Sequence, residues 1–189
     1  MRVISGSLKG KEYLRLPKNS RPTKSILKEA LLMTLLSHKK KKAQSLYCFA
    51  DICCGSGAIG IEFISSGYES AILMDIDIRP AYENFSSLGI EDQIELYRRD
   101  FRKIRPNMEC FEKLGKSDIF FDPPYHFWKD KKFANDVKSQ FDTISPLSLI
   151  IEHPVDIDVD FSFDELEFLW KKSFGDSALS FFCRRENDN

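Results

Sequence analysis

The chain has 189 residues, of which 42% are hydrophobic and 30% are charged, and its formal net charge is −1. This length and composition are ordinary for one soluble globular domain with a short appendage. No apolar run approaches the ~20 residues that a membrane helix needs, and the N-terminal sequence is not a secretory signal. These observations exclude a membrane protein and predict a cytoplasmic one.

The first elements of the chain are predicted to be a small ribbon and a helix. Residues 1–16 alternate in character, which suggests a small β-ribbon. Residues 23–37 follow helical spacing through Leu27, Leu31 and Leu35. The lysine run at 39–42 is typical of a solvated linker, with RNA contact as the alternative.

Charge divides the chain into two predicted parts. Residues 1–45 hold twelve Lys or Arg and two Glu, whereas residues 46–189 hold 16 basic and 27 acidic residues. A basic extension on an acidic body allows nucleic-acid binding even though the whole chain is nearly neutral. We therefore predict a basic RNA-binding extension over 1–45 and a main domain over 46–189.

In the main domain, strand-like and helix-like segments alternate along the chain. Strands are predicted at 46–52, 70–77, 93–100, 117–125 and 148–154, and helices at 58–66, 79–88 and 129–142. Two further strands, 165–172 and 177–185, look like a closing antiparallel hairpin. This alternation predicts an α/β fold with a mostly parallel seven-stranded sheet and helices on both faces.

The cysteines and histidines do not form a metal-binding pattern. There are five cysteines without a C-x-x-C pair, and three histidines of which no two lie at metal-ligand spacing. We expect reduced, buried thiols and no metal.

A glycine-rich loop follows the first strand of the main domain. Gly55, Gly57 and Gly60 have G-x-G-x-x-G spacing, and Asp75 follows twenty positions after Gly55. This spacing fits NAD or another adenosine-containing cofactor. Asp51 decides between them, because its carboxylate would repel a pyrophosphate but would favour the cationic sulfonium and ammonium of S-adenosylmethionine. The pattern D-x-x-x-G-x-G therefore favours S-adenosylmethionine.

The sequence FFDPPY at 120–125 ends the fourth strand of the main domain. The carboxylate of Asp122 and the carbonyl of Pro123 could accept the hydrogens of a conjugated amine, so that its lone pair turns toward a methyl donor. Tyr125 offers a face on which an extruded base could stack. The alternative is a tight turn that ends the strand, and the glycine loop upstream favours the functional interpretation.

The order D-x-x-x-G-x-G, then D-P-P-Y, resembles that of class I methyltransferases that modify exocyclic or side-chain amide nitrogens. The N-terminal part resembles the opening of the bacterial RsmD-type small-subunit rRNA (guanine-N2)-methyltransferases, which have R-I-I-x-G-x-x-x-G-x-x-L, then R-P-T, then a helix with R-E. The corresponding residues here are Arg2, Val3, Ile4, Gly6, Gly10, Leu14, Arg21, Pro22, Thr23, Lys28 and Glu29. The resemblance covers essentially the whole chain.

The resemblance implies a Rossmann-like class I methyltransferase fold that uses S-adenosyl-L-methionine. It implies that the methionine part of the cofactor is lined by Asp51, Gly55, Ser56 and Gly57. By the same resemblance Asp75 binds the ribose, Asp100 accepts from the adenine amine, and Phe101 lies near the adenine ring. The target guanine is held by Asp122, Pro123, Pro124 and Tyr125. The residues expected to contact RNA phosphates are Arg2, Lys9, Lys11, Arg21, Lys24 and Lys28.

Two departures from the family pattern are visible. Cys53 and Cys54 stand where the family usually has Phe and a small residue, a change that affects packing more than chemistry. Lys28 replaces the usual arginine and loses its bidentate fork, which affects RNA binding more than methyl transfer.

The sequence therefore predicts methylation of the N2 amine of a guanine in bacterial 16S rRNA. The substrate is expected to be 16S rRNA or the small ribosomal subunit, and the protein a monomer without a membrane or metal partner. Three alternatives remain: an N6-adenine rRNA or DNA methyltransferase, a protein-glutamine methyltransferase, and a non-enzymatic RNA-binding assembly factor. The intact Asp51, Asp75 and Asp122 argue against the last.

Overall fold

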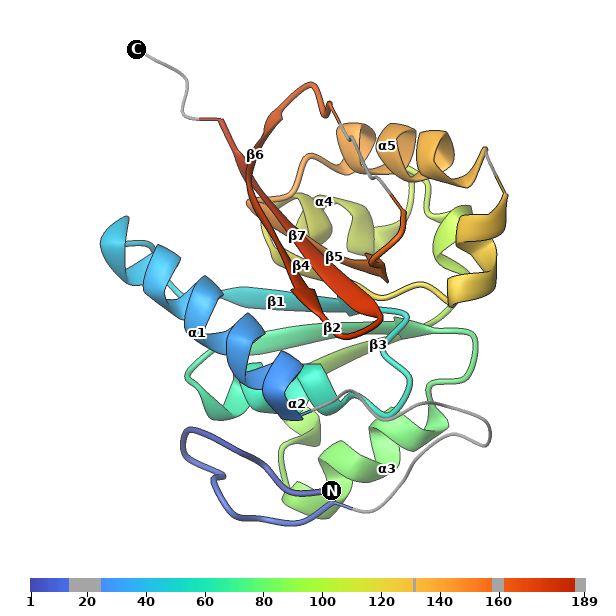
Figure 1. Ribbon diagram of the computed structural model, residues 1–189. Coiled ribbons are helices and arrows are strands. Elements are labelled where there is room, and N and C mark those ends of the chain that lie inside the picture. Colours follow the sequence, from blue (N-terminus) through green and yellow to red (C-terminus); the bar gives the residue numbers. More distant parts are fainter. Residues whose placement is uncertain (14–24, 131, 158–161, 186–189) are drawn as a thin grey trace. The chain divides into compact units, whose positions relative to one another are not determined.

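A computed structural model describes residues 1–13, 25–130, 132–157 and 162–185 (Figure 1). The chain splits into two compact units, Met1–Arg99 and Asp100–Asn189. The first unit contains both the N-terminal residues and the glycine loop. The predicted functional division at residue 45 therefore lies inside one compact unit, and it stays a prediction.

Seven strands form one sheet in the order β3-β2-β1-β4-β5-β7-β6. In the first unit β1 (Cys48–Ile52), β2 (Ser70–Asp75) and β3 (Ile94–Arg98) are parallel neighbours. In the second unit β4 (Asp118–Phe121) is parallel to β5 (Ser148–Pro154), and β7 (Ser177–Arg184) is antiparallel to both β5 and β6 (Leu166–Phe174). The predicted mostly parallel seven-stranded sheet with its closing hairpin is confirmed.

The helices of the first unit are α1 (Ser25–Lys41), α2 (Ala58–Ser65) and α3 (Arg79–Leu88). Every residue of α2 is buried, and Phe63 stacks on Phe49 of β1 with ring centroids 3.8 Å apart. Gly60 allows this close packing, because a Cβ at that position would lie 2.7 Å from Leu73 of β2. The first helix after the glycine loop is thus held against the sheet.

The N-terminal residues that the structure describes, 1–13, form a short antiparallel ribbon, as predicted, while residues 14–16 of the prediction lie outside the described residues. Val3 N–H donates to the Lys11 carbonyl at 2.9 Å, Tyr13 N–H donates to the Met1 carbonyl at 2.9 Å, and a β-bridge pairs Arg2 with Glu12. The segment also contacts α2: Ile4 N–H donates to the Glu62 carboxylate, and Leu8 N–H donates to Ser65 Oγ at 2.9 Å. Gly6 has φ +75°, and a Cβ there would lie 1.8 Å from the Ser65 carbonyl oxygen. Hydrogen bonds within the ribbon and contacts with α2 therefore both shape this segment.

The second unit contains α4 (Glu109–Gly115), which the sequence did not predict, and α5 (Phe133–Ile144). The helix expected from residue 129 begins later, because residues Tyr125–Lys129 form a 3₁₀ helix, η3. Another 3₁₀ helix, η2 (Phe101–Lys103), opens the unit, and η1 (Glu91–Gln93) precedes β3 in the first unit. Among the described residues, no helix is long and apolar enough to cross a membrane.

Candidate functional site

The loop after β1 adopts a conformation that suits close approach of a ligand to the backbone. Cys53, Gly55 and Gly57 all have positive φ values, of 66°, 53° and 71°. Gly57 caps the N-terminus of α2, and the Ser56 carbonyl accepts from the side chain of Asn84 at 2.9 Å. The glycines are therefore placed as predicted, between a buried strand and the start of a buried helix.

Asp51 lies in β1 and is almost fully buried. Its side chain accepts a hydrogen bond from Gly60 N–H at 3.1 Å, and the residue is 2% exposed. Burial raises the pKa of Asp51 to about 7, against the lowering effect of the Gly60 hydrogen bond. A second carboxylate, Asp75, adds to the rise. A cation nearby would favour the ionised form of this carboxyl group, and an anion nearby would disfavour it.

Asp75 ends β2 and is tied to the glycine loop. Its Oδ2 accepts from Gly55 N–H at 2.9 Å, and its Oδ1 accepts from Asp77 N–H at 3.3 Å. The structure therefore brings Asp75 and the predicted loop together in one cluster with Asp51. Asp77 itself pairs with Arg79 at 2.7 Å, which lowers the pKa of Asp77 to about 2.

In the second unit, Asp100 and Phe101 lie at the start of η2. Asp100 forms an ion pair with Arg102 at 2.6 Å and caps η2 by accepting from Arg102 N–H at 3.0 Å, which lowers the pKa of Asp100. Phe101 is buried among aromatic rings, 4.7 Å from Phe121 and 6.2 Å from Phe127 between centroids. Asp100 is thus held ionised at an edge of this aromatic cluster.

The D-P-P-Y sequence directly follows β4. Asp122 is half-buried, Pro123 is buried, and Pro124 caps the N-terminus of η3. β4 ends at Phe121, before the two prolines that were predicted to stop this strand, because proline cannot donate to a strand ladder. The rigid turn places Asp122 at the carboxyl end of a buried strand.

Tyr125 is anchored by its hydroxyl group. The hydroxyl lies 2.5 Å from Ser177 Oγ and 3.3 Å from Glu152 Oε1. Partial burial raises the pKa of Tyr125 to about 12, so the phenol is protonated at neutral pH. Sequence reasoning missed Ser177 and Glu152; the signal for Glu152 was an acid at the carboxyl end of β5, the strand parallel to β4.

The predicted RNA-binding residues differ in their surroundings. Lys9 and Lys11 are exposed, and exposed Arg2 pairs with Glu12 at 2.8 Å. Arg21 and Lys24 lie outside the described residues, as do Pro22 and Thr23 of the predicted signature.

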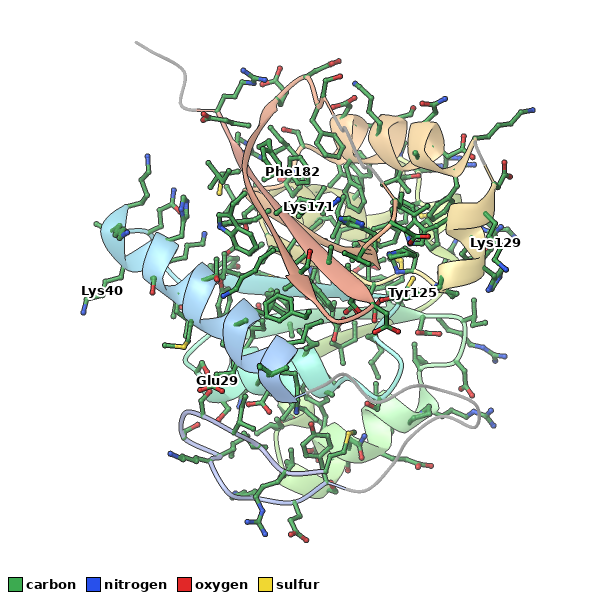
Figure 2. The ribbon with its side chains drawn as sticks, in the orientation of Figure 1. Glu29, Lys40, Tyr125, Lys129, Lys171 and Phe182 are labelled. Atoms are coloured by element: carbon green, nitrogen blue, oxygen red, sulfur yellow. The ribbon has the colours of Figure 1, made fainter. Side chains whose placement is uncertain are left out.

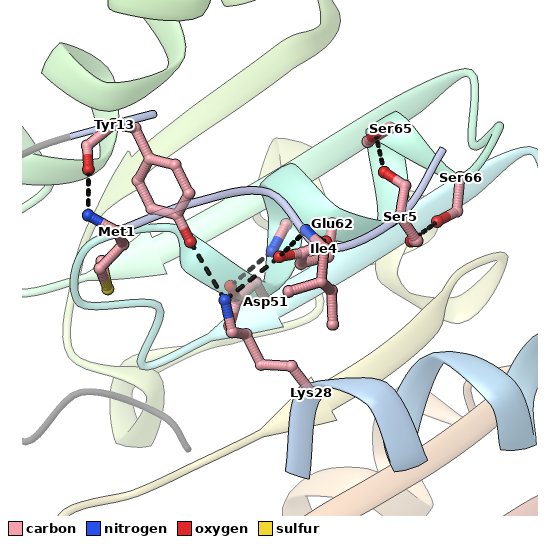
Figure 3. A network of polar contacts seen from close by, with 10 residues as sticks. Met1, Ile4, Ser5, Tyr13, Lys28, Asp51, Glu62, Ser65 and Ser66 are labelled. Atoms are coloured by element: carbon pink, nitrogen blue, oxygen red, sulfur yellow. Dashed lines mark hydrogen bonds and ion pairs between the residues drawn. The ribbon is translucent and has the colours of Figure 1, made fainter. Parts of the chain in front are cut away.

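The prediction that Lys28 contacts RNA phosphates is wrong for this structure. Lys28 is 3% exposed, and its Nζ lies 3.1 Å from Oε1 of Glu62, a residue with no exposed surface. Nζ also donates to the Tyr13 hydroxyl at 3.3 Å, so the side chain joins α1 to α2 and to the N-terminal segment (Figure 3). A buried, paired ammonium is not available to a phosphate in solution.

Over the described ranges, no group of three or more His, Cys, Asp or Glu side chains could hold a metal ion. All five cysteines are free thiols. Burial raises the pKa of the Cys54 thiol, and the carboxylates of Asp51 and Asp75 add to this rise, which makes the thiol a poor nucleophile.

The fold and the loop geometry define a class: a Rossmann-like sheet of the class I methyltransferase type. A structure from Escherichia coli titled "Putative methyltransferase yhhF" matches with a TM-score of 0.70 at 19% identity, over 97% of each chain. The N-methyltransferase NodS from Bradyrhizobium japonicum, in complex with S-adenosyl-L-homocysteine, matches with a TM-score of 0.59 at 11% identity, over 84% of this chain and 88% of that one.

The family is defined by sequence comparison. The chain belongs to the family described as "Conserved hypothetical protein 95", whose model matches residues 1–183. It is 27% identical to the putative rRNA methyltransferase YlbH of Bacillus subtilis, over 98% of this chain and 100% of that protein. It is 35% identical to the ribosomal RNA small subunit methyltransferase D of Buchnera aphidicola, over 70% of this chain and 67% of that protein. The resemblance to the RsmD type is confirmed.

Proposed function

We propose that this protein is an S-adenosyl-L-methionine-dependent methyltransferase that methylates the N2 amine of a guanine in 16S rRNA. The observation that carries the proposal is the D-P-P-Y turn at the end of β4, in a chain whose curated relatives are named as rRNA methyltransferases. A substrate in ribosomal RNA places the reaction in the cytoplasm.

The residues of the first unit fit S-adenosylmethionine. Asp75 is a partly exposed carboxylate at a strand end beside the loop, which suits ribose hydroxyl groups. The carboxyl group of Asp51 lies beside the loop, and its ionised form would be favoured by a cationic ligand and disfavoured by a pyrophosphate. When bound, the cofactor supplies an electrophilic methyl group on a sulfonium.

The second unit carries the groups that would act on the guanine amine. The Asp122 carboxylate and the Pro123 carbonyl accept the two N–H hydrogens, which directs the nitrogen lone pair away from the ring plane. The amine nitrogen would take the methyl group that the bound cofactor supplies, and the proton that it then loses would go to the Asp122 carboxylate, which already accepts one of its hydrogens. Asp122 stabilises the positive charge that develops on nitrogen, and Tyr125 stacks on the base.

The test is methylation of a 16S rRNA transcript and of small subunits that lack the modification, with isotopically labelled cofactor and digestion to nucleosides. We expect labelled N2-methylguanosine. Labelled N6-methyladenosine would support the adenine alternative. A translation release factor, the substrate expected of the protein-glutamine alternative, is supplied as a third substrate. Its labelling without transfer to either RNA substrate would support that alternative.

A second measurement separates an enzyme from an assembly factor. Methylated guanines are mapped in 16S rRNA from cells with and without this gene. We expect one guanine to lose its methyl group in the deletion strain, and a plasmid copy to restore it. RNA binding without any change in methylation would favour the assembly factor.

A further inference from the structure

The second unit carries a basic segment within an otherwise acidic domain. Residues 101–132 hold eight basic and five acidic residues, whereas residues 46–100 hold three and ten, and residues 133–189 hold five and twelve. The acidic balance of the main domain therefore hides a local excess of positive charge. The segment that carries this excess, residues 101–132, includes the D-P-P-Y turn and the two 3₁₀ helices η2 and η3.

The aromatic contacts place η2 beside η3. Phe101 of η2 lies 6.2 Å from Phe127 of η3, and both rings contact Phe133, with centroid distances of 5.9 and 5.4 Å. The guanidinium of Arg102 lies over the Phe127 ring at 4.6 Å from its centroid. The cations of the two short helices consequently share one surface.

The charged groups on this surface are exposed. We name it the η2–η3 surface, and its basic residues are Arg102, Lys103, Arg105, Lys129 and Lys132. The guanidinium of Arg105 donates to the carbonyls of Arg102 and Ile104, which keeps it against η2. Phe127 is half-buried, with Arg102 over its ring and His126 beside it, so the exposed part of this aromatic residue adjoins a cation.

The surface begins at the proposed base-binding residue. Tyr125 and Lys129 are the two ends of η3 (Figure 2). At about 2 Å per residue, a 3₁₀ helix separates their backbones by about 8 Å. A nucleic-acid strand with one phosphate per about 3.4 Å of axis spans that distance in about two nucleotides. A strand that delivers its base to Tyr125 would therefore carry its neighbouring phosphates past these cations.

We propose that the η2–η3 surface binds the RNA strand that flanks the target nucleotide. Its cations contact the phosphates, and the exposed part of Phe127 contacts an adjacent base. This proposal rests on the proposed function, and it adds a second RNA-binding region to the basic N-terminal extension.

The experiment compares two triple variants that remove the same charge from the second unit. The test variant is Lys103→Gln, Arg105→Gln and Lys129→Gln, which spares Arg102 because that residue pairs with Asp100. The matched control is Lys171→Gln, Lys172→Gln and Arg185→Gln, three exposed residues outside the η2–η3 surface. Binding of a 16S rRNA transcript is measured over a series of KCl concentrations.

We expect the test variant to lower RNA affinity at least tenfold and to reduce the slope of log K against log salt by about 0.7–0.9 for each phosphate that is no longer neutralised. The control should keep the wild-type slope, and both variants should keep wild-type affinity for the cofactor. An equal decrease in both variants, or no decrease in the test variant, would overturn the proposal. Wild-type protein that neither binds nor methylates the transcript or the small subunit would instead overturn the proposed function.

Discussion

At the scale of single residues, Asp122 is the group on which the proposed chemistry depends. Asp122→Ala should lower kcat by at least about 100-fold, a typical loss for one preorganised electrostatic group, while cofactor affinity stays within a few-fold. Asp122→Asn keeps an acceptor oxygen without the charge and should retain more activity than the alanine variant. Single-turnover methylation of a 16S rRNA substrate measures both. An alanine variant that reacts at the wild-type rate would show that D-P-P-Y is only a turn that ends the strand.

Substitution can separate the proposed stacking of Tyr125 from the hydrogen bonds that its hydroxyl makes. Tyr125→Phe keeps the ring for stacking but removes the hydroxyl that binds Ser177 and Glu152, so we expect a mild loss of about tenfold in kcat. Ser177→Ala removes a hydrogen-bond partner of the same hydroxyl group, so it should lower kcat by a similar factor. Tyr125→Ala should be severe, because stacking is abolished as well. Single-turnover rates that rank the Ser177 variant below Tyr125→Ala would contradict this division.

Asp51 gives the free protein a specific pH dependence. Its pKa rises from 3.8 to about 7 on folding, so the folded protein binds this proton more tightly than the unfolded chain does. The stabilisation is complete below pH 3.8 and is lost as the pH rises toward 7. Asp51→Asn should therefore flatten the fall in unfolding free energy over this interval, measured by urea denaturation. An unchanged pH profile would show that Asp51 does not hold this proton.

At the scale of elements, strands and loops were predicted well where the signal was local. The strand before the glycine loop is a short apolar run that ends in an acid, and it forms β1. Helix α4 was missed because its seven residues bury only Cys110 and Leu114, too few for a periodic pattern. The positions of Asp51 and Asp75 followed from strand ends. Their hydrogen bonds to the glycine loop depend on backbone geometry that spacing does not specify.

The packing of α1 onto α2 shows why the role of Lys28 could not be predicted. Its partner Glu62 lies 34 residues away along the chain, and a basic residue in a basic extension gives no sign of burial. The same holds for the N-terminal segment, whose partners Glu62 and Ser65 lie 57 or more residues away. Local alternation therefore predicted the ribbon, whose backbone hydrogen bonds lie within residues 1–13, but not its contacts with α2.

The buried ion pair predicts a large stability effect from one substitution. Lys28→Met leaves the Glu62 carboxylate buried without its cation, which should cost about 3–5 kcal/mol of unfolding free energy. The double variant Lys28→Met and Glu62→Gln should recover much of this loss. Lys40→Met, at an exposed lysine of α1, serves as the control (Figure 2). Urea denaturation measures all three, and a single variant as stable as the control would contradict the pairing.

At the scale of the whole molecule, positive charge is concentrated in two regions, and an acidic remainder separates them in sequence. The first region is the N-terminal extension, and the second is the segment 101–132 that contains the η2–η3 surface. Charge of this kind acts through the phosphates of RNA and makes affinity fall steeply with salt. The acidic remainder would repel RNA and restrict it to these regions.

The N-terminal region should contribute to RNA affinity independently of the η2–η3 surface. The variant Arg2→Gln, Lys9→Gln and Lys11→Gln should lower the salt slope by about 0.7–0.9 per phosphate that these side chains neutralise in the wild type, and it should leave cofactor affinity unchanged. The Arg2–Glu12 pair is exposed, so it competes only weakly with a phosphate. Combined with the η2–η3 triple variant, the two reductions in slope should add, because the two sets of residues share no partner and independent sites act additively. RNA binding with the wild-type slope in the N-terminal variant would show that the basic extension does not contact the phosphates, and that the second unit carries the interface alone.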